Sequence, residues 1–307
     1  MQPSLRNRAS TNLFLFFDRL GLHVLPKHFY TPVADYDWLR KNRDAWEPAW
    51  DMRGVHWNLD EQLSWVKDVC SDYVAEVAGL EFYKSLEAEG LGLGYGPIES
   101  QVLHAFIRKF TPRRIVEVGS GVSTGCALHA VWRNEAEEKG PSEIVCIEPF
   151  PKRQFANVRE VTHVQSFVQT VDRRVFDQLG PGDLLFIDSS HAVKTGSDVT
   201  MLFLEVLPKL RSGVYVHIHD IFFPYLYAPN VLKSVFGWQE TTLLAALLSG
   251  NSRLRVRASL SGLHYGRQRE LMALLPDYRP QTLQSGVWGP SEDTDLHFPS
   301  SIYLEVL

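Results

Sequence analysis

The chain has 307 residues, of which 45% are hydrophobic and 22% charged, a composition typical of a folded globular protein with one large domain and room for an appendage. Lys and Arg total 31 against 36 for Asp and Glu, giving a formal net charge of −5. This balance argues against the broad basic face on which nucleic-acid binding usually depends and leaves only a local basic groove open, so we expect no nucleic-acid partner. The composition also indicates that any disorder is confined to the first dozen residues.

The cysteines and the N-terminus argue for a cytoplasmic protein. Cys70, Cys126 and Cys146 lie far apart without a CxxC pair, which indicates neither a disulfide framework nor a zinc knuckle. The apolar stretch Leu13–Phe17 is too short for the core of a signal peptide. No window reaches the length of a membrane span, so we expect no membrane partner.

Residues 1–95 are predicted to form a helical and irregular lid. Five of the eight tryptophans fall there, and apolar residues spaced three or four apart from Asp60 to Glu89 predict one amphipathic helix. An aromatic-rich segment of this kind also suits a dimer interface, so a homo-oligomer is an open alternative. Four glycines between Gly90 and Gly96 indicate a hinge or a loop that approaches a ligand closely.

Residues 96–307 are predicted to form the second unit, an α/β domain. A helix over 98–110 precedes alternating strands and helices, and runs such as Leu184–Ile187 are apolar throughout, as in parallel strands covered on both faces. The pattern predicts a doubly wound, Rossmann-like, seven-stranded, mostly parallel sheet whose last strand is antiparallel. The expected strands are 114–118, 144–148, 163–168, 183–187, 213–219, 253–259 and 301–307, and the expected helices are 123–138, 152–160, 172–179, 197–210 and 238–249.

A glycine turn after the first strand is typical of a nucleotide-binding site. Gly119 and Gly121 follow Glu117, and a turn of this kind brings bare backbone close to a ligand. Thr124 stands where a dinucleotide motif has its third glycine. The second strand ends at Glu148, a carboxylate placed to accept two hydrogen bonds from a ribose diol.

Three segments together resemble the class I S-adenosylmethionine-dependent methyltransferases: residues 117–123, residues 147–149, and the strand 183–187 with the following Asp-Ser-Ser-His. The similarity is greatest to a bacterial small-molecule branch with a catechol O-methyltransferase-like core, and it covers about residues 95 to 307. It implies that S-adenosylmethionine is the cofactor and that the residues around it are Tyr95, Glu117, Gly119, Ser120, Gly121, Ser123, Glu148, Ser166 or Phe167, and Asp188.

Histidines and aspartates follow the fourth and fifth predicted strands. Asp188 precedes His191 by three residues, and His219 and Asp220 close the fifth strand. Because parallel strands deliver their functional groups at their carboxyl ends, we expect these side chains to meet. His191 is the candidate general base for deprotonating the methyl acceptor, with His219 and Asp220 as further catalytic candidates.

The same groups form a candidate metal site. Related O-methyltransferases bind a divalent ion through acids at these two strand ends, and here the ligands would be Asp188, His219 and Asp220. A histidine in the set suits manganese, iron or zinc better than magnesium. General-base catalysis without a metal is the alternative.

The expected reaction is methyl transfer to a hydroxyl, or less readily an amine, of a small molecule or sugar. The aromatic loop 222–227 either shapes the acceptor pocket or packs in the core. An NAD-dependent oxidoreductase is the second hypothesis, disfavoured by Thr124 and by the lack of a catalytic tyrosine–lysine pair. A non-catalytic cofactor-binding protein is the third, and the dense His/Asp edge argues against it.

Overall fold

The computed structural model describes residues 5–25, 31, 33–91, 94–151, 155, 158–234, 237–281 and 296–307. The predicted helix over 152–160 therefore lies largely outside the described residues. Among the helices that are described, none combines the length and the apolar character needed to cross a membrane.

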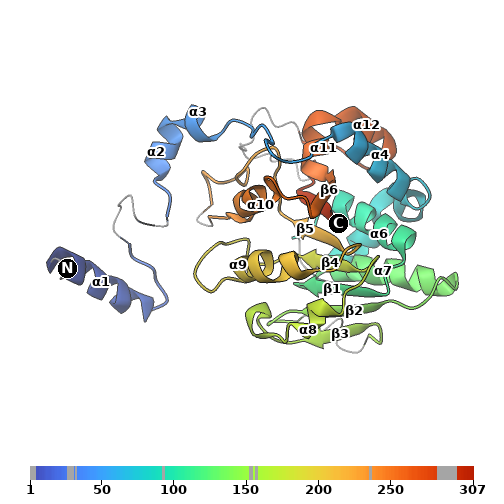
Figure 1. Ribbon diagram of the computed structural model, residues 1–307, viewed down its shortest axis with the longest axis horizontal. Helices are drawn as coiled ribbons and strands as arrows, with labels where there is room; N and C mark the ends of the chain where they lie inside the picture. The colour runs from blue at the N-terminus through green and yellow to red at the C-terminus, as the bar shows by residue number, and fades with distance from the viewer. Residues whose placement is uncertain are drawn as a thin grey trace.

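A seven-stranded sheet forms the centre of the molecule (Figure 1). Its strand order is β3-β2-β1-β4-β5-β7-β6, with β1 to β5 parallel and β7 antiparallel to both of its neighbours. The predicted Rossmann-like sheet with an antiparallel last strand is thus confirmed. The strands are β1 (Arg114–Val118), β2 (Glu143–Ile147), β3 (Val161–Val164), β4 (Leu184–Ile187), β5 (Tyr215–His219), β6 (Leu254–Ser259) and β7 (Ser301–Val306).

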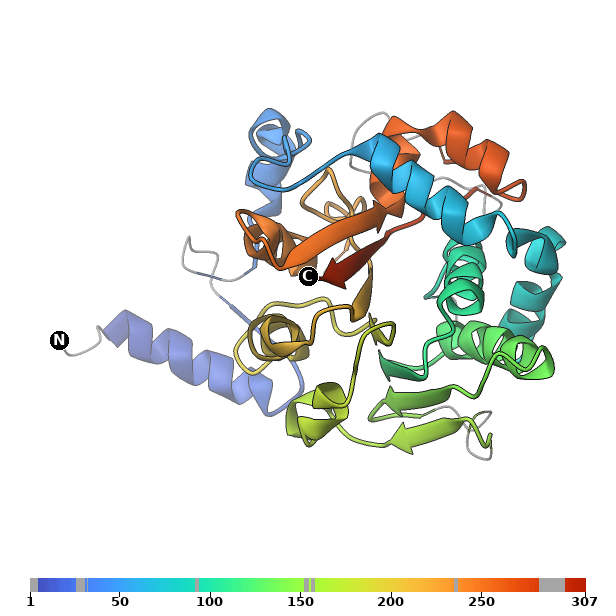
Figure 2. The ribbon, with the colours of Figure 1, turned by 45° about the vertical axis from the view of Figure 1, so that its right-hand side comes forward.

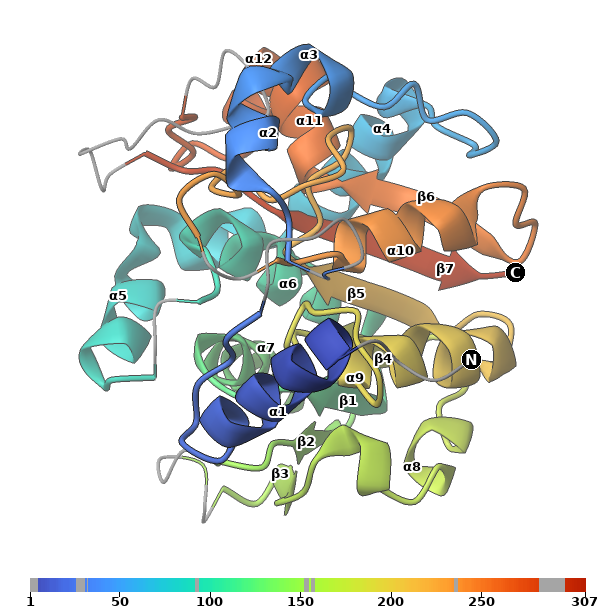
Figure 3. The same cartoon turned by 90° about the vertical axis from the view of Figure 1, so that its left-hand side faces the viewer.

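Helices cover both faces of the sheet (Figures 2 and 3), as buried strands such as the wholly apolar β4 require. One hydrophobic core joins α4, α6, α7 and α11 to the sheet, and a second core joins α9 and α10 to the opposite face. The described helices are α1 (Leu5–Asp18), α2 (Tyr36–Lys41), α3 (Arg43–Trp46), α4 (Leu59–Cys70), α5 (Glu81–Ala88), α6 (Pro97–Phe110), α7 (Val122–Ala136), α8 (Arg174–Asp177), α9 (Asp198–Met201), α10 (Glu240–Leu248), α11 (Leu260–Gly266) and α12 (Gln268–Leu274), with the short turns η1 (Val74–Leu80), η3 (Val168–Thr170), η4 (Leu202–Val206) and η5 (Leu207–Lys209).

The N-terminal segment contains several short helices instead of one long one. The predicted helix over 60–89 is wrong in its continuity, because the backbone turns left-handed at Gly79 (φ 79°) and Leu80 (φ 61°) and separates α4 and η1 from α5. Helix α4 packs on α6 and β6, and α1 lies apart from the rest of the molecule (Figure 1). Helix α4 therefore shares a hydrophobic core with the sheet.

Two predicted elements are displaced. The strand expected over 163–168 is β3 at Val161–Val164, because Val161 pairs in register with Ile144 of β2. The helix expected over 197–210 begins as α9 and continues through the π turn η4 and the 3-10 turn η5. Helices α11 and α12, which lie between β6 and β7, were not predicted.

Candidate functional site

The glycine turn between β1 and α7 allows a close contact that no other residue permits. Gly119 has φ +115°, and a Cβ built there would lie 2.5 Å from the backbone oxygen of Asp188. The Gly119 amide donates to the Ile147 carbonyl at 3.0 Å. The end of β1 is therefore held against the ends of β2 and β4, and only glycine fits.

Glu117 secures this turn to the helix that follows it. Its buried carboxylate accepts hydrogen bonds from the Ser123 hydroxyl at 2.5 Å and the Thr124 hydroxyl at 2.8 Å. Burial raises the pKa of Glu117 to about 7, against the opposing effect of these two hydrogen bonds. Ser120 Oγ lies 3.3 Å from Thr124 Oγ1, so the polar side chains of the motif largely satisfy one another.

A cavity of about 330 Å³ opens where β1, β2 and β4 end, at the position that a doubly wound sheet uses for its ligand. Four of the predicted cofactor residues line it: Gly119, Glu148, Phe167 and Asp188. The other predicted cofactor residues are not among its lining: Tyr95, Glu117, Ser120, Gly121, Ser123 and Ser166. The Ser166 hydroxyl instead lies 2.7 Å from Thr170 Oγ1.

The chemistry of this cavity fits a nucleoside. The Phe167 ring lines the cavity and is 57% exposed, which leaves aromatic surface for a flat base. The 75% exposed Phe150 ring lies beside it, edge to face, with the two centroids 6.1 Å apart. One oxygen of Glu148 accepts the Phe150 amide at 2.8 Å, which orients the carboxylate beside the cavity. An acid in this place can accept hydrogen bonds from ribose hydroxyls.

Tyr95 is placed in the interior. Its hydroxyl donates to the Glu99 carbonyl at 3.1 Å and lies 2.9 Å from His217 Nε2. The ring is 2% exposed and packs 5.1 Å from the His219 ring. The Tyr95 hydroxyl therefore supports the histidines of β5 and does not face the cavity at Glu148.

The strand ends β4 and β5 bring the predicted Asp and His residues together. His191 Nε2 lies 3.4 Å from both Asp188 Oδ1 and Asp220 Oδ2. Asp188, His191 and Asp220 each offer one ligand atom within 4.8 Å of the others, and the described residues contain no other group of this kind. This Asp–His–Asp cluster includes two of the three predicted metal ligands, with His191 in place of His219.

Glu240 fixes the imidazole of His191. This buried residue begins α10, and its Oε2 lies 2.8 Å from His191 Nδ1, while the backbone of His191 turns left-handed at φ +57°. Burial lowers the pKa of His191, but hydrogen bonds with Asp188 and Glu240 and the charge of Asp220 outweigh it and raise the pKa to about 10. The sequence predicts neither the contact between Glu240 and His191 nor the left-handed backbone conformation of His191.

His219 lies among three carboxylates. Its Nδ1 is 3.6 Å from Asp188 Oδ1 and 3.5 Å from Asp220 Oδ2, and its Nε2 is 3.3 Å from Glu99 Oε1. Burial alone would lower the pKa of His219, yet the surrounding carboxylates raise it well above its ordinary value. Both ring nitrogens are buried without a well-formed hydrogen bond.

Glu99 and Ser300 complete the cluster and were not predicted. Glu99 accepts from the Gly96 amide at 3.2 Å and the Ser300 amide at 2.9 Å. Ser300, immediately before β7, also donates its hydroxyl to Asp220 Oδ1 at 3.0 Å. An acid in the first turn of a helix normally caps that helix, so the sequence carried no signal of a second role.

Comparisons with known proteins agree with this geometry. A family model described as a methyltransferase domain matches residues 116–221, from β1 through the end of β5. An uncharacterized protein of Archaeoglobus fulgidus is 27% identical over 168 residues, which are 50% of this chain and 72% of the relative.

Two solved structures are similar at low identity. A candidate protein-L-isoaspartate O-methyltransferase from Plasmodium falciparum, in complex with S-adenosyl-L-homocysteine, is 12% identical, with 45% of this chain and 82% of that chain covered and a TM-score of 0.26. A plantazolicin methyltransferase, in complex with a desmethyl-plantazolicin analogue and S-adenosylhomocysteine, is 11% identical, with 78% and 97% covered and a TM-score of 0.34.

Residues 116–221, from β1 to β5, match a methyltransferase domain, and the strand order and the glycine turn of this region are those of a Rossmann-like fold. The cavity at the ends of β1, β2 and β4 is compatible with a nucleoside. The closer likeness to a catechol O-methyltransferase-like branch stays a prediction.

Proposed function

We propose that the protein is an S-adenosylmethionine-dependent methyltransferase that methylates a hydroxyl group of a small molecule, and that the Asp–His–Asp cluster activates this hydroxyl. One observation carries the proposal: Asp188 lines the cofactor cavity and also belongs to the cluster. The methyl donor and the groups that handle the acceptor proton would therefore be neighbours.

The reaction assigned to the site is a single displacement. The acceptor oxygen forms a bond to the methyl carbon while the carbon–sulfur bond breaks and its electron pair returns to sulfur, leaving S-adenosylhomocysteine. The hydroxyl proton leaves toward the carboxylates and histidines of the cluster. An oxygen is favoured over an amine because an alcohol hydroxyl needs such assistance at neutral pH.

The spacing within the cluster supports a divalent cation. At 3.4 Å the Nε2 atom of His191 is too far from Asp188 and Asp220 for strong hydrogen bonds. Ligands bound at about 2.1 Å around one octahedral ion stand about 3 Å apart, close to this separation. Glu240 holds the other ring nitrogen of His191, as an outer carboxylate commonly does for a histidine ligand.

The donor set selects among metals. Two carboxylates and an imidazole suit manganese, iron or zinc better than magnesium, which prefers oxygen ligands alone. A cation held by Asp188, His191 and Asp220 would supply Lewis-acid activation of the acceptor hydroxyl. His191 would then serve as a ligand, and the charge of the cation would offset the carboxylates around His219. The His219 ring, which faces the cluster through Nδ1, could then accept the proton.

General-base catalysis by His191 without a metal is less well supported. Three carboxylates, those of Asp188, Asp220 and Glu240, face its ring and stabilise the protonated form. A protonated imidazole cannot accept the acceptor proton. His191 could take that role only if positive charge elsewhere in the cluster offset these carboxylates.

Calorimetry and a chelator test the proposal. S-Adenosylmethionine should bind and NADH should not, and methyl transfer should stop in EDTA and return with manganese more fully than with magnesium. Full activity in EDTA would remove the metal from the mechanism, while preferential binding of NADH would contradict the function itself.

A further inference from the structure

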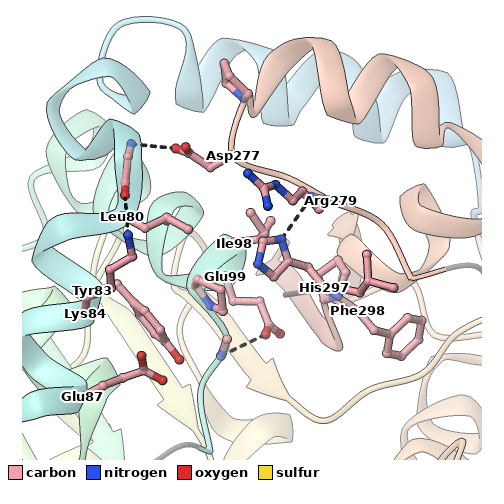
Figure 4. Close-up of a pocket in the computed structure, with 16 residues that line it drawn as sticks. Leu80, Tyr83, Lys84, Glu87, Ile98, Glu99, Asp277, Arg279, His297 and Phe298 are labelled. Carbon is pink, nitrogen blue, oxygen red and sulfur yellow. Dashed lines mark hydrogen bonds between the residues drawn. The ribbon is translucent and has the colours of Figure 1, made fainter. Parts of the chain in front are cut away.

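A second cavity, of about 570 Å³, lies between the α5–α6 region and the residues that precede β7 (Figure 4). Tyr83, Lys84 and Glu87 of α5 line one side, and Arg279 and His297 line the other. This volume is in the range of small-molecule sites. The cavity shares no lining residue with the cofactor cavity at Glu148.

Glu99 connects this second cavity to the Asp–His–Asp cluster. Its side chain lines the cavity, and its Oε1 lies 3.3 Å from His219 Nε2. On its other side, His219 Nδ1 lies 3.6 Å from Asp188, which lines the cofactor cavity. His219 thus stands between the two cavities, with one ring nitrogen directed to each side.

The lining of the second cavity is polar and carries charges of both signs. Lys84 and Arg279 are exposed cations, and the acids Glu87, Glu99 and Asp277 are distributed among them. Lys84 pairs with Glu81 at 3.1 Å and Asp277 accepts from Gln101 at 2.8 Å, and an apolar occupant would remove these groups and the other charges from water at a considerable free-energy cost. A molecule rich in hydroxyls could donate to the carboxylates and accept from the cations at the same time.

Aromatic side chains provide the complementary apolar surface. The rings of Tyr83, His297 and Phe298 lie among the charged groups (Figure 4). Flat rings can cover the C–H face of a sugar while the polar groups engage its hydroxyls. We infer that this cavity binds the body of the methyl acceptor, that the acceptor is sugar-like, and that its reacting hydroxyl extends beyond the cavity toward the Asp–His–Asp cluster. This inference rests on the proposed methylation of a hydroxyl.

Ligand-detected NMR on the full chain, saturated with S-adenosylhomocysteine and manganese, tests this assignment. The probes are glucose, rhamnose, glucuronate and UDP-glucose, with catechol as the aromatic comparison. At least one sugar should bind, and Glu87→Gln and Arg279→Met should each weaken its binding tenfold or more. A larger loss for glucuronate than for glucose in Arg279→Met would show that the guanidinium receives a carboxylate.

Two exposed residues of α12 give matched controls. Glu270→Gln and Arg269→Met remove the same charges outside the cavity lining and should leave sugar binding unchanged. The sugar assignment is overturned if none of the four sugars binds, if the cavity variants bind them as the wild type does, or if catechol competes at this cavity. If S-adenosylhomocysteine still binds in any of these cases, the result rejects only the sugar site and does not contradict the proposed methyl transfer.

Discussion

Glu240 Oε2 lies 2.8 Å from Nδ1 of His191, and both side chains are buried. The first residue of α10 thereby orients a ring whose other nitrogen faces two aspartates from different strand ends. The preorganisation of the Asp–His–Asp cluster depends on this contact across the fold.

Glu240→Gln should weaken manganese binding about 10- to 100-fold, the usual effect of losing an outer carboxylate behind a histidine ligand. The substitution keeps the shape of the side chain but removes the charge that orients His191. Calorimetric titration with manganese measures the change, and Glu270→Gln on the surface of α12 is the control. Equal affinities in the two variants would show that Glu240 has only a packing role.

Gly119→Ala should abolish most cofactor binding and destabilise the fold, since its methyl group would press on the Asp188 carbonyl. Gly140→Ala is a matched control, because Gly140 has a similar φ of +106° with nothing within 4 Å of the added carbon. The control should cost about 1 kcal/mol of unfolding free energy and leave S-adenosylmethionine binding intact. Denaturation measures the loss of stability and calorimetry the loss of cofactor affinity. Similar cofactor affinities in both variants would show that the close contact between Gly119 and the Asp188 carbonyl is not needed for binding.

His191→Ala should reduce methyl transfer about a hundredfold or more, whether the ring serves as a ligand or as a base. Cofactor affinity should change little, because His191 does not line the cofactor cavity. Radiolabelled methyl transfer measures turnover, and His56→Ala, at an exposed histidine, is the control. Wild-type turnover in His191→Ala would exclude this residue from both roles.

The free energy of unfolding should fall at acidic pH, because buried His104 takes up a proton less readily in the folded chain than in the unfolded one. Burial lowers the pKa of this histidine from 6.5 to about 4, against its contact with Glu76 at 2.8 Å. Between these values the unfolded chain binds more protons than the folded one, so stability falls as the pH drops from 6.5 toward 4. The loss at pH 5 is on the order of 2 kcal/mol.

Urea denaturation at pH 7 and pH 5 isolates this effect. His104→Gln should lose less stability between the two pH values than the wild type, whereas His56→Gln should follow the wild type. The same pH dependence in all three proteins would show that other groups control acid unfolding.

The central sheet could be predicted because its signals are local. Strands such as Leu184–Ile187 are apolar throughout, and Gly119 and Gly121 follow the first of the strands at the expected place. Helices α11 and α12 carried no such signal, because both are short and depend on packing beside α4. The break near Gly79 lies in a stretch whose apolar spacing continues across it.

The cluster was only partly predictable. Asp188, His191, His219 and Asp220 follow strand ends, so topology alone brings them together. Glu99 and Glu240 reach the same place from the first residues of helices, where an acid has an ordinary explanation as a cap. The choice between His191 and His219 as ligand depends on side-chain direction, which the sequence pattern does not encode.

The reversed strand β7 bears on how the protein is made. It lies between β5 and β6, so β6 has no partner in the sheet until β7 arrives, and Ser300 at its start supplies hydrogen bonds to Glu99 and Asp220. During synthesis on a ribosome, the strands β1 to β5 emerge before β6 and β7 and can pair early. The hydrogen bonds of Ser300 with Glu99 and Asp220 therefore form last, and the contact of Ser300 with Glu99 joins residues that are among the most distant sequence partners in the described part of the chain.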